Sequence, residues 1–274
     1  MCSWAEVDID KMGIIGLISE DDSNSIWLQS IMYNRALISS TSLTQIMERN
    51  QVLLKSHVSY VPEYVIRDSN MTPEMVLHGL ALSYENGNEW KRFGLELCSF
   101  FSIDCKKDLS LLSEEQNRIF VIISALLQPC KLYLLERPGK QIRREYYIDL
   151  LKEFAKKIPI GADIIIAENT VSDIVLPCAS YLFLKEGEIV AQYSRAQLPK
   201  PAKILTIKGG DWTWLESNHV TIIQNKGNKA TFLCKDMETR ELALRICKTG
   251  CDDFRVEDIS VEDLVFGNYQ RWSL

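Results

Sequence analysis

Three glutamates of this chain stand where a carboxylate could hold a metal ion or take up a proton. Glu63, Glu136 and Glu168 each follow an apolar run that is typical of a buried strand. Magnesium prefers carboxylate oxygens as ligands, and a positioned carboxylate can act as a general base. One interpretation therefore places Glu136 on a metal ion and gives the role of base to Glu63 or Glu168.

Two oppositely charged clusters also come at the ends of predicted strands. The acidic cluster is Glu20, Asp21 and Asp22, and the basic cluster is Arg137, Lys140, Arg143 and Arg144. One hypothesis is that the two clusters meet at an edge of a sheet and partly neutralise each other. The alternative is that both are ordinary solvated loops, whose exposed pairs add only ~0–1 kcal/mol to stability.

The composition is that of a globular protein. Hydrophobic residues make up 46% and charged residues 25% of the 274 residues, enough for one large domain and a small one. The formal net charge of -6 argues against a nucleic-acid partner. The N-terminus lacks the basic and apolar regions of a signal peptide, and no apolar stretch reaches the ~20 residues that span a bilayer.

The cysteines do not form a recognisable framework. All eight are scattered without a CxxC pair, and the chain has three histidines. A zinc site is therefore not expected. Reduced, buried thiols in a cytoplasmic protein are the simplest interpretation.

Strands alternate with helices over the first part of the chain, which predicts a mostly parallel sheet covered on both faces. The predicted strands are 7–10, 12–18, 58–61, 131–135, 164–167, 181–184 and 189–193, and the predicted helices are 26–47, 75–84, 90–101, 113–127, 143–157 and 171–174. Thr72 and Pro73 form a helix start, as cap and first helical residue.

A linker at 199–201, Pro-Lys-Pro, separates this part from a smaller one. We place the domains at residues 1–195 and 196–274. The second domain is predicted to be a compact α+β appendage, with strands 204–208, 220–224, 230–234 and 254–259 and helices 238–249 and 261–266.

Three consecutive blocks of the sequence resemble the motifs of a known protein family. The polar loop Leu112–Gln116 opens a helix with the apolar run Ile119–Leu127, and the buried strand block Lys131–Pro138 follows. This order resembles the signature loop, helix and Walker B strand of ATP-binding cassette (ABC) ATPases, and with the flanking blocks the resemblance covers roughly residues 7–193. It implies an α/β, P-loop NTPase-like ABC ATPase core with a helical subdomain at about 71–115, plus the C-terminal α+β appendage.

The resemblance puts the phosphate loop, Gly-x-x-x-x-Gly-Lys-Ser/Thr, on residues 19–26. Ser19 and Asn24 take the glycine positions, Ser25 the lysine position, and Ile26 that of the magnesium-binding hydroxyl. The acids at 20–22 would repel phosphate by ~1 kcal/mol per charge pair in water. This loop is poorly suited to a triphosphate.

The signature loop is changed as well. The resemblance aligns it with Ser113, Glu114, Glu115 and Gln116, and the two glutamates replace glycines that bind the γ-phosphate held by a partner subunit. These carboxylates would block the close backbone approach and repel the phosphate.

The other motif positions are partly kept. Glu63 stands at the Q-loop glutamine and Glu136 at the Walker B carboxylate, while Arg137 replaces the catalytic glutamate and Asn169 the switch histidine. Arginine cannot serve as a general base near pH 7. We therefore expect no catalytic residue, no resident cofactor or metal, and no ATP hydrolysis, since the changed motifs disfavour ATP and magnesium.

The resemblance implies a pseudo-ATPase subunit of an ABC-type exporter, structural or regulatory in role. The last segment, Phe254–Phe266, is similar to the tail of exporter-type cassettes. Such a subunit would lie in the cytoplasm at the inner face of the membrane, docked on an integral-membrane subunit, and would pair with an active ABC ATPase or with itself. The alternatives are an active ABC ATPase with non-standard motifs, and a soluble regulatory or immunity-type interaction module.

Overall fold

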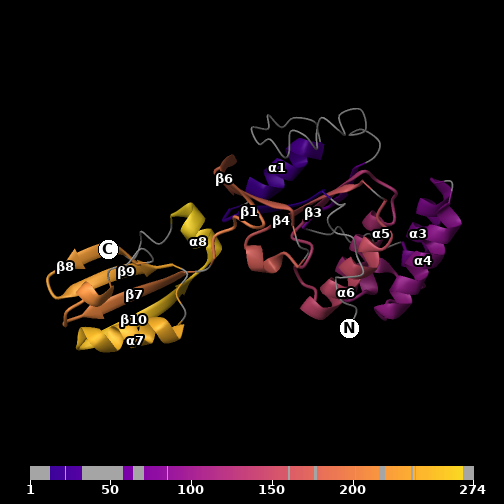
Figure 1. The fold of residues 1–274 in the computed structure, drawn as a ribbon. Helices are drawn as coiled ribbons and strands as arrows, with labels where there is room; N and C mark the ends of the chain where they lie inside the picture. The colour runs from indigo at the N-terminus through magenta and orange to yellow at the C-terminus, as the bar shows by residue number, and fades with distance from the viewer. Residues whose placement is uncertain are drawn as a thin grey trace. The chain divides into compact units, whose positions relative to one another are not determined.

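The computed structural model describes residues 13–21, 23–32, 58–63, 71–84, 86–159, 161–175, 178–200, 202–215, 220–235, 237 and 239–267. The chain forms two compact units, Met1–Arg195 and Ala196–Leu274 (Figure 1). The strand predicted at 7–10 and the predicted helix beyond Met32 lie outside the described residues.

The first unit is built on a six-stranded sheet. Its strands are β1 (Gly13–Ser19), β2 (Val58–Val61), β3 (Leu132–Glu136), β4 (Asp163–Glu168), β5 (Ser180–Lys185) and β6 (Glu188–Ser194). They lie in the order β2-β3-β4-β1-β5-β6, and all are parallel except β6, which forms an antiparallel hairpin with β5. The predicted mostly parallel sheet is confirmed.

Helices cover both faces of this sheet (Figure 1). On one face lies α1 (Ser23–Met32), whose Trp27 and Leu28 pack against Leu17, Leu134 and Ile165. On the other face lie α5 (Glu114–Leu126) and α6 (Arg144–Ala155). Because the central strands are buried on both sides, they read in the sequence as continuous apolar runs.

A helical pair packs beside α5. It consists of α3 (Pro73–Leu82) and α4 (Gly87–Phe100), and the 3-10 turn η3 (Leu109–Leu111) leads on to α5. The side chain of Thr72 caps α3 by accepting the N–H of Met75, as predicted. Gly87 is required where the helices meet, because a Cβ there would lie 1.8 Å from the carbonyl oxygen of Ala81.

The second unit is an α+β fold, as predicted. Its sheet contains β7 (Ala202–Lys208), β8 (Val220–Lys226), β9 (Lys229–Cys234) and β10 (Asp253–Ile259) in the antiparallel order β10-β7-β9-β8. The helices are α7 (Thr239–Thr249) and α8 (Val261–Phe266), with a 3-10 turn, η5 (Thr213–Leu215). Leu242 and Ile246 of α7 pack on one face of the sheet.

None of the helices in the described ranges is both long and apolar enough to span a bilayer.

Candidate functional site at the ends of the parallel strands

Three parallel strands end side by side. In the strand register Ile18 of β1 pairs with Glu168, and Glu136 of β3 pairs with Ala167, so Ser19, Glu136 and Glu168 lie along one edge. The carboxyl edge of a parallel sheet is where α/β proteins usually bind ligands. The structure therefore brings three predicted site residues, Ser19, Glu136 and Glu168, together at one edge of the sheet.

The connection from β1 to α1 is short. It comprises residues 20–22, because β1 ends at Ser19 and α1 begins at Ser23. The predicted helix began at Ile26, so α1 starts three residues earlier than predicted. Ser19 Oγ donates to the Asp21 carboxylate at 2.5 Å, and Asp21 N–H donates back to Ser19 Oγ at 3.3 Å. The connection therefore folds back onto the last residue of β1.

The first turn of α1 is tied to the sheet. Asn24 is fully buried and its Nδ2 donates to the carbonyl of Glu168 at 3.0 Å. Ile26 is 66% exposed, and its side chain has no oxygen with which to hold a metal ion. Ser25 Oγ donates to the Glu136 carboxylate.

Glu136 is surrounded by protein donors. Its side chain accepts hydrogen bonds from Ser25 Oγ, from Tyr60 Oη at 2.5 Å, and from the backbone N–H of Glu63 at 3.1 Å. Burial and then the hydrogen bond to Glu136 raise the pKa of Tyr60 well above its ordinary value, so the phenol keeps the proton that it donates. Both oxygens of the buried Glu136 carboxylate are thereby engaged.

Glu63, at the Q-loop position, is held in the same way. Its side chain is 2% exposed and pairs with Arg137 Nη1 at 3.0 Å and with Lys140 Nζ. Burial alone would raise the pKa of Glu63, but Lys140 and Arg137 together hold it below its usual value. The carboxylate therefore stays ionised between two cations.

A turn at Arg137 ends β3. Arg137 adopts a left-handed φ of +40°, and its N–H donates to Ala167 O at 2.8 Å. A left-handed non-glycine residue costs ~1–2 kcal/mol. The fully buried Arg118 holds the turn, because its Nη2 donates to the carbonyls of Glu136 at 2.8 Å and Arg137 at 3.0 Å, and its Nη1 to Pro62 O.

The residues at the signature position form a separate cluster at the start of α5. Ser113 accepts the N–H of Gln116 at 3.2 Å and Gln116 Oε1 accepts the N–H of Ser113 at 3.1 Å, which is a capping box. Glu115 accepts the N–H of Arg143 at 2.8 Å and its Nε at 3.1 Å. Glu114 is exposed beside them.

The basic cluster therefore has identified partners. Arg137 and Lys140 bind Glu63, and Arg143 binds Glu115 and lies 4.0 Å over the ring of Tyr146. Neither carboxylate belongs to the acidic cluster that the sequence offered as partner. Neutralisation between the acidic and basic clusters stays a prediction.

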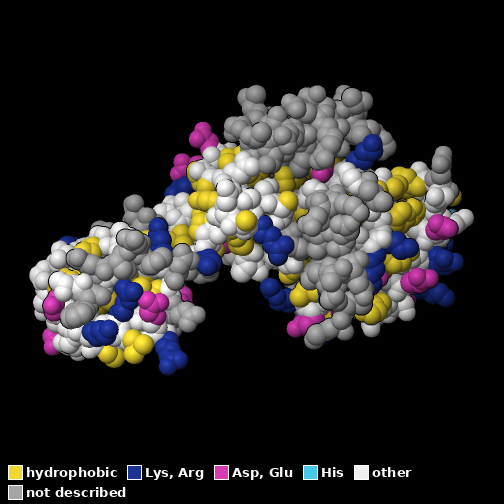
Figure 2. All heavy atoms as spheres, viewed as in Figure 1, with side chains coloured by type: hydrophobic (Ala, Val, Ile, Leu, Met, Phe, Trp, Pro, Cys, Tyr) yellow, Lys and Arg dark blue, Asp and Glu magenta, His cyan; other side chains and the backbone are white. Residues whose placement is uncertain are grey.

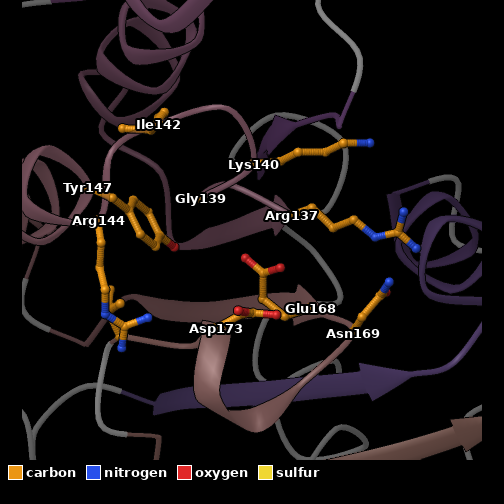
Figure 3. A pocket seen from close by; sticks show the side chains of 10 residues that line it. Arg137, Gly139, Lys140, Ile142, Arg144, Tyr147, Glu168, Asn169 and Asp173 are labelled. Carbon is orange, nitrogen blue, oxygen red and sulfur yellow. The ribbon is translucent and has the colours of Figure 1, made fainter.

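Sequence reasoning missed two residues of the site. Tyr60 and Arg118 were not selected, although both touch the turn or the carboxylate at the end of β3. Tyr60 lies on β2, three residues before Glu63, where an aromatic residue reads as an ordinary strand residue. Asn169, at the switch position, is exposed and lines a cavity with Arg137 and Glu168 (Figure 3).

No protein-family model matches this chain, and no curated protein matches its sequence. Its structure is similar to solved ABC proteins. The ATP-binding subunit of an ABC transporter superposes with a TM-score of 0.52 and 17% identity, over 66% of this chain and 78% of that one. The dimeric structure of a bacterial ABC transporter cassette gives 0.50 and 15%, over 67% and 85%.

A post-hydrolysis structure of that cassette, bound to ADP and phosphate, gives a TM-score of 0.51 and 14% identity, over 69% of this chain and 87% of that one. At sequence identities this low, the structural similarity establishes the fold alone. This chain has the α/β fold of ABC transporter ATP-binding subunits.

Proposed function

We propose that this chain is a catalytically degenerate, nucleotide-binding-domain-like subunit of an ABC-type exporter, with a structural or regulatory role. The observation that carries the proposal is the occupied carboxylate of Glu136. Ser25, Tyr60 and the Glu63 N–H donate hydrogen bonds to both oxygens of this carboxylate, which a magnesium ion would need as ligands. Hydrogen bonds to a charged group are worth ~1.5–3 kcal/mol each, so the ion would have to displace favourable contacts.

The residues at the phosphate loop do not fit MgATP either. A phosphate-binding loop needs four residues between its two glycines, and its backbone N–H groups wrap the phosphates. Here the connection between β1 and α1 is only residues 20–22, Glu-Asp-Asp, because α1 already begins at Ser23. No lysine follows to neutralise a triphosphate.

Of the two glutamates that could replace a catalytic base, one is held in ion pairs and the other lies on the opposite face of the sheet from α1. Glu63 is held by Arg137 and Lys140, and Arg137 itself stands in the position of the base. The other base that the sequence offered, Glu168, lies on the α6 side of the sheet, since it alternates with Ile165 and Ala167, which pack under α1. These contacts favour the pseudo-ATPase over the active ATPase.

Docking on a membrane subunit is supported by the helical subdomain. Figure 2 shows several exposed apolar side chains on the part of the molecule that contains α3 and α4. Met75 is 55%, Leu82 77% and Phe100 63% exposed. An apolar surface of this kind is typical of an interaction site.

Pairing with a second cassette would be of limited catalytic use. In a pair of cassettes, each composite site takes a phosphate loop from one subunit and a signature loop from the other. The acidic connection at residues 20–22 would impair the first part, and Glu115, which already forms an ion pair with Arg143, would impair the second. The chain is therefore proposed as a scaffold in such a pair, whether the partner is an active ATPase or a second copy. A cytoplasmic place at the inner face of the membrane follows from this role.

Phosphate release from MgATP tests the enzymatic part. We expect the wild-type chain to release phosphate no faster than a Glu136→Gln, Glu63→Gln double variant. A wild-type rate clearly above that of the variant would refute the pseudo-ATPase and favour an active ATPase.

Detergent pull-down tests the subunit part. We expect the chain to capture an integral-membrane protein, and a Leu82→Glu, Phe100→Glu variant to lose it. Leu244→Glu, at a residue that is 59% exposed in the appendage, is the matched control and should keep the partner. Only soluble partners would favour the interaction module instead.

A further inference from the structure

A cavity lies at the carboxyl ends of β3 and β4, on the α6 side of the sheet (Figure 3). Its volume is about 410 Å³, within the range of small-molecule sites. The loop from β3 to α6, the first turn of α6 and the segment after β4 form its walls, which carry polar side chains beside the apolar Ile142 and Val175. The cavity therefore suits a small molecule that has both polar and apolar surface.

Two buried polar atoms of this cavity have no hydrogen-bond partner among the described residues. They are Oη of Tyr147, which is 2% exposed, and Oε1 of Glu168, which is 6% exposed. Figure 3 shows both side chains directed into the same space. The N–H of Gly139 donates to the Glu168 carboxyl, which accounts for part of its capacity. Buried polar groups are rarely left unsatisfied, so we expect a polar partner for these two atoms.

The two atoms are neighbours, but they do not bond each other. Burial, and next the charge of Glu168, raise the pKa of Tyr147 well above its ordinary value, so the two groups interact through space. Neither atom is the hydrogen-bond partner of the other. A third group placed between them can therefore bond both.

A hydroxyl is the group that fits this position best. The high pKa of Tyr147 keeps the proton on the phenol, whereas burial and then Asp173 raise the pKa of Glu168 to about 8, so near neutral pH its carboxyl exists with and without a proton. A hydroxyl can accept from the acid and donate to the carboxylate. An ammonium group cannot accept and a ligand carboxylate cannot donate, so each would suit one form of Glu168 alone.

The charged walls do not form a site for an ion. Figure 3 shows Arg144 and Lys140 on opposite sides of the cavity and directed away from each other, so the two cations do not converge on one acidic group. An anion would also meet Glu168 and Asp173, whose interaction helps to raise the pKa of Glu168. A cation would meet the arginine and lysine side chains that line the cavity. These walls favour an uncharged ligand.

The Tyr147 hydroxyl is held in a fixed place. The loop after β3 lies directly on its ring, because a Cβ on Gly139 would lie 3.0 Å from Cε1 and 3.1 Å from Cδ1 of Tyr147. The ring therefore has little room to turn its hydroxyl away from the cavity. A phenylalanine ring would fill the same space without the hydroxyl.

We propose that this cavity binds a small uncharged polyol, open-chain or cyclic, with one of its hydroxyls held between Tyr147 Oη and Glu168 Oε1. The carbon chain of the polyol would lie against Ile142 and Val175. The carboxylate of Glu136, which carries the proposed function, does not line this cavity. The polyol site therefore does not depend on the pseudo-ATPase role.

Calorimetry on the full chain at pH 7 tests the proposal. The uncharged probes are sorbitol, glucose and myo-inositol at millimolar concentration. Gluconate and glucosamine are their charged counterparts, since they carry a carboxylate and an ammonium group on a similar carbon chain. We expect at least one uncharged probe to bind, and to bind about tenfold or more tightly than either charged one, a difference of about 1.4 kcal/mol.

Variants locate the binding. Tyr147→Phe should weaken the bound probe by about tenfold and keep the fold, which a thermal melt checks, because the lost hydroxyl has no partner among the described residues. Glu168→Met should weaken it as well, whereas Glu168→Gln should keep it, because an amide can both donate and accept. Tyr146→Phe, at the neighbouring residue outside the cavity, is the matched control and should bind as the wild type does.

Three results would overturn the proposal. If none of the uncharged probes binds the wild-type chain, the cavity holds water only. If gluconate or glucosamine binds more tightly than the uncharged probes, the ligand is an ion. If a probe binds but Tyr147→Phe and Glu168→Met bind it as tightly as the wild type does, it lies elsewhere.

Discussion

The hydroxyl of Tyr60 donates to the carboxylate of Glu136 across 2.5 Å, and so joins β2 to the end of β3. This contact gives the carboxylate at the Walker B position of the resemblance a partner within the protein. The same carboxylate accepts from Ser25 on α1 and from the N–H of Glu63. Under the proposed function, these three contacts close the site at Glu136 to a metal ion and a nucleotide.

The contact predicts a stability loss in Tyr60→Phe. A buried carboxylate that loses a donor bears a desolvation cost, and we expect the free energy of unfolding to fall by ~1–3 kcal/mol. Urea unfolding measures it. Tyr193→Phe, at a half-buried residue of β6, is the control and should change stability by less than ~0.5 kcal/mol. Equal effects of the two variants would contradict the closed site.

Glu63→Gln should also destabilise the fold, because it leaves two cations around a neutral amide. Breaking a buried ion pair costs ~3–5 kcal/mol, and we expect the lower part of this range because the Lys140 side chain is 43% exposed. A change below ~1 kcal/mol in urea unfolding would show that the pair is only a surface contact.

The same carboxylate predicts a pH dependence. The folded state lowers the pKa of Glu63 below 4.5, since its cations outweigh the opposing effect of burial. Its stabilisation is therefore complete above pH 4.5 and is lost as the pH falls towards the lower folded value. The stability difference between the wild type and Glu63→Gln should shrink over that window, and a constant difference would contradict the pairing.

Glu168 predicts the opposite trend. Burial first, and then Asp173, raise its pKa to about 8. The folded state holds the proton more tightly, so the carboxyl becomes more costly to stability as the pH rises from 4.5 to about 8. Relative to wild type, Glu168→Gln should become more stable across this window, by ~1.4 kcal/mol per unit of pKa shift at most. Thermal melts at pH 5 and pH 8 check this, and no growth in the difference would contradict it.

Replacing single motif residues should not create a nucleotide site. Ser25→Lys with Ile26→Ser supplies the lysine and the hydroxyl of the expected phosphate loop, but Ser19 and Asn24 remain at its glycine positions and α1 still begins at Ser23 after a short connection. We expect no binding of a fluorescent ATP analogue. Saturable binding by this variant would show that the loop can rearrange, and that its length is not the obstacle.

The sequence predicts most of the elements because their causes are local. Continuous apolar runs identify β3 and β4, and Thr72 with Pro73 identifies the start of α3. The early start of α1 is not visible in this way. The predicted start at Ile26 came from helical periodicity in the sequence, whereas the observed start at Ser23 comes with the packing of α1 on the sheet.

The partners within the site could not be predicted, because they are set by the fold. Arg137 lies 74 positions from Glu63 in sequence, and the two meet because β2 and β3 are neighbours. The charge pattern alone suggests the acids at residues 20–22 as the partners of the basic cluster. Arginine side chains are almost never fully buried, yet Arg118 is 1% exposed and donates to the carbonyls at the turn of Arg137.

Binding of MgATP to the purified full chain tests the central claim most directly. Calorimetry with millimolar MgATP, together with a thermal-shift measurement, should give no heat of binding and no change in melting temperature. A ligand at about 100 times its Kd would add about 2.7 kcal/mol and raise the melting temperature by ~2–4 °C in a domain of this size. Saturable heat with such a rise would contradict the closed site at Glu136.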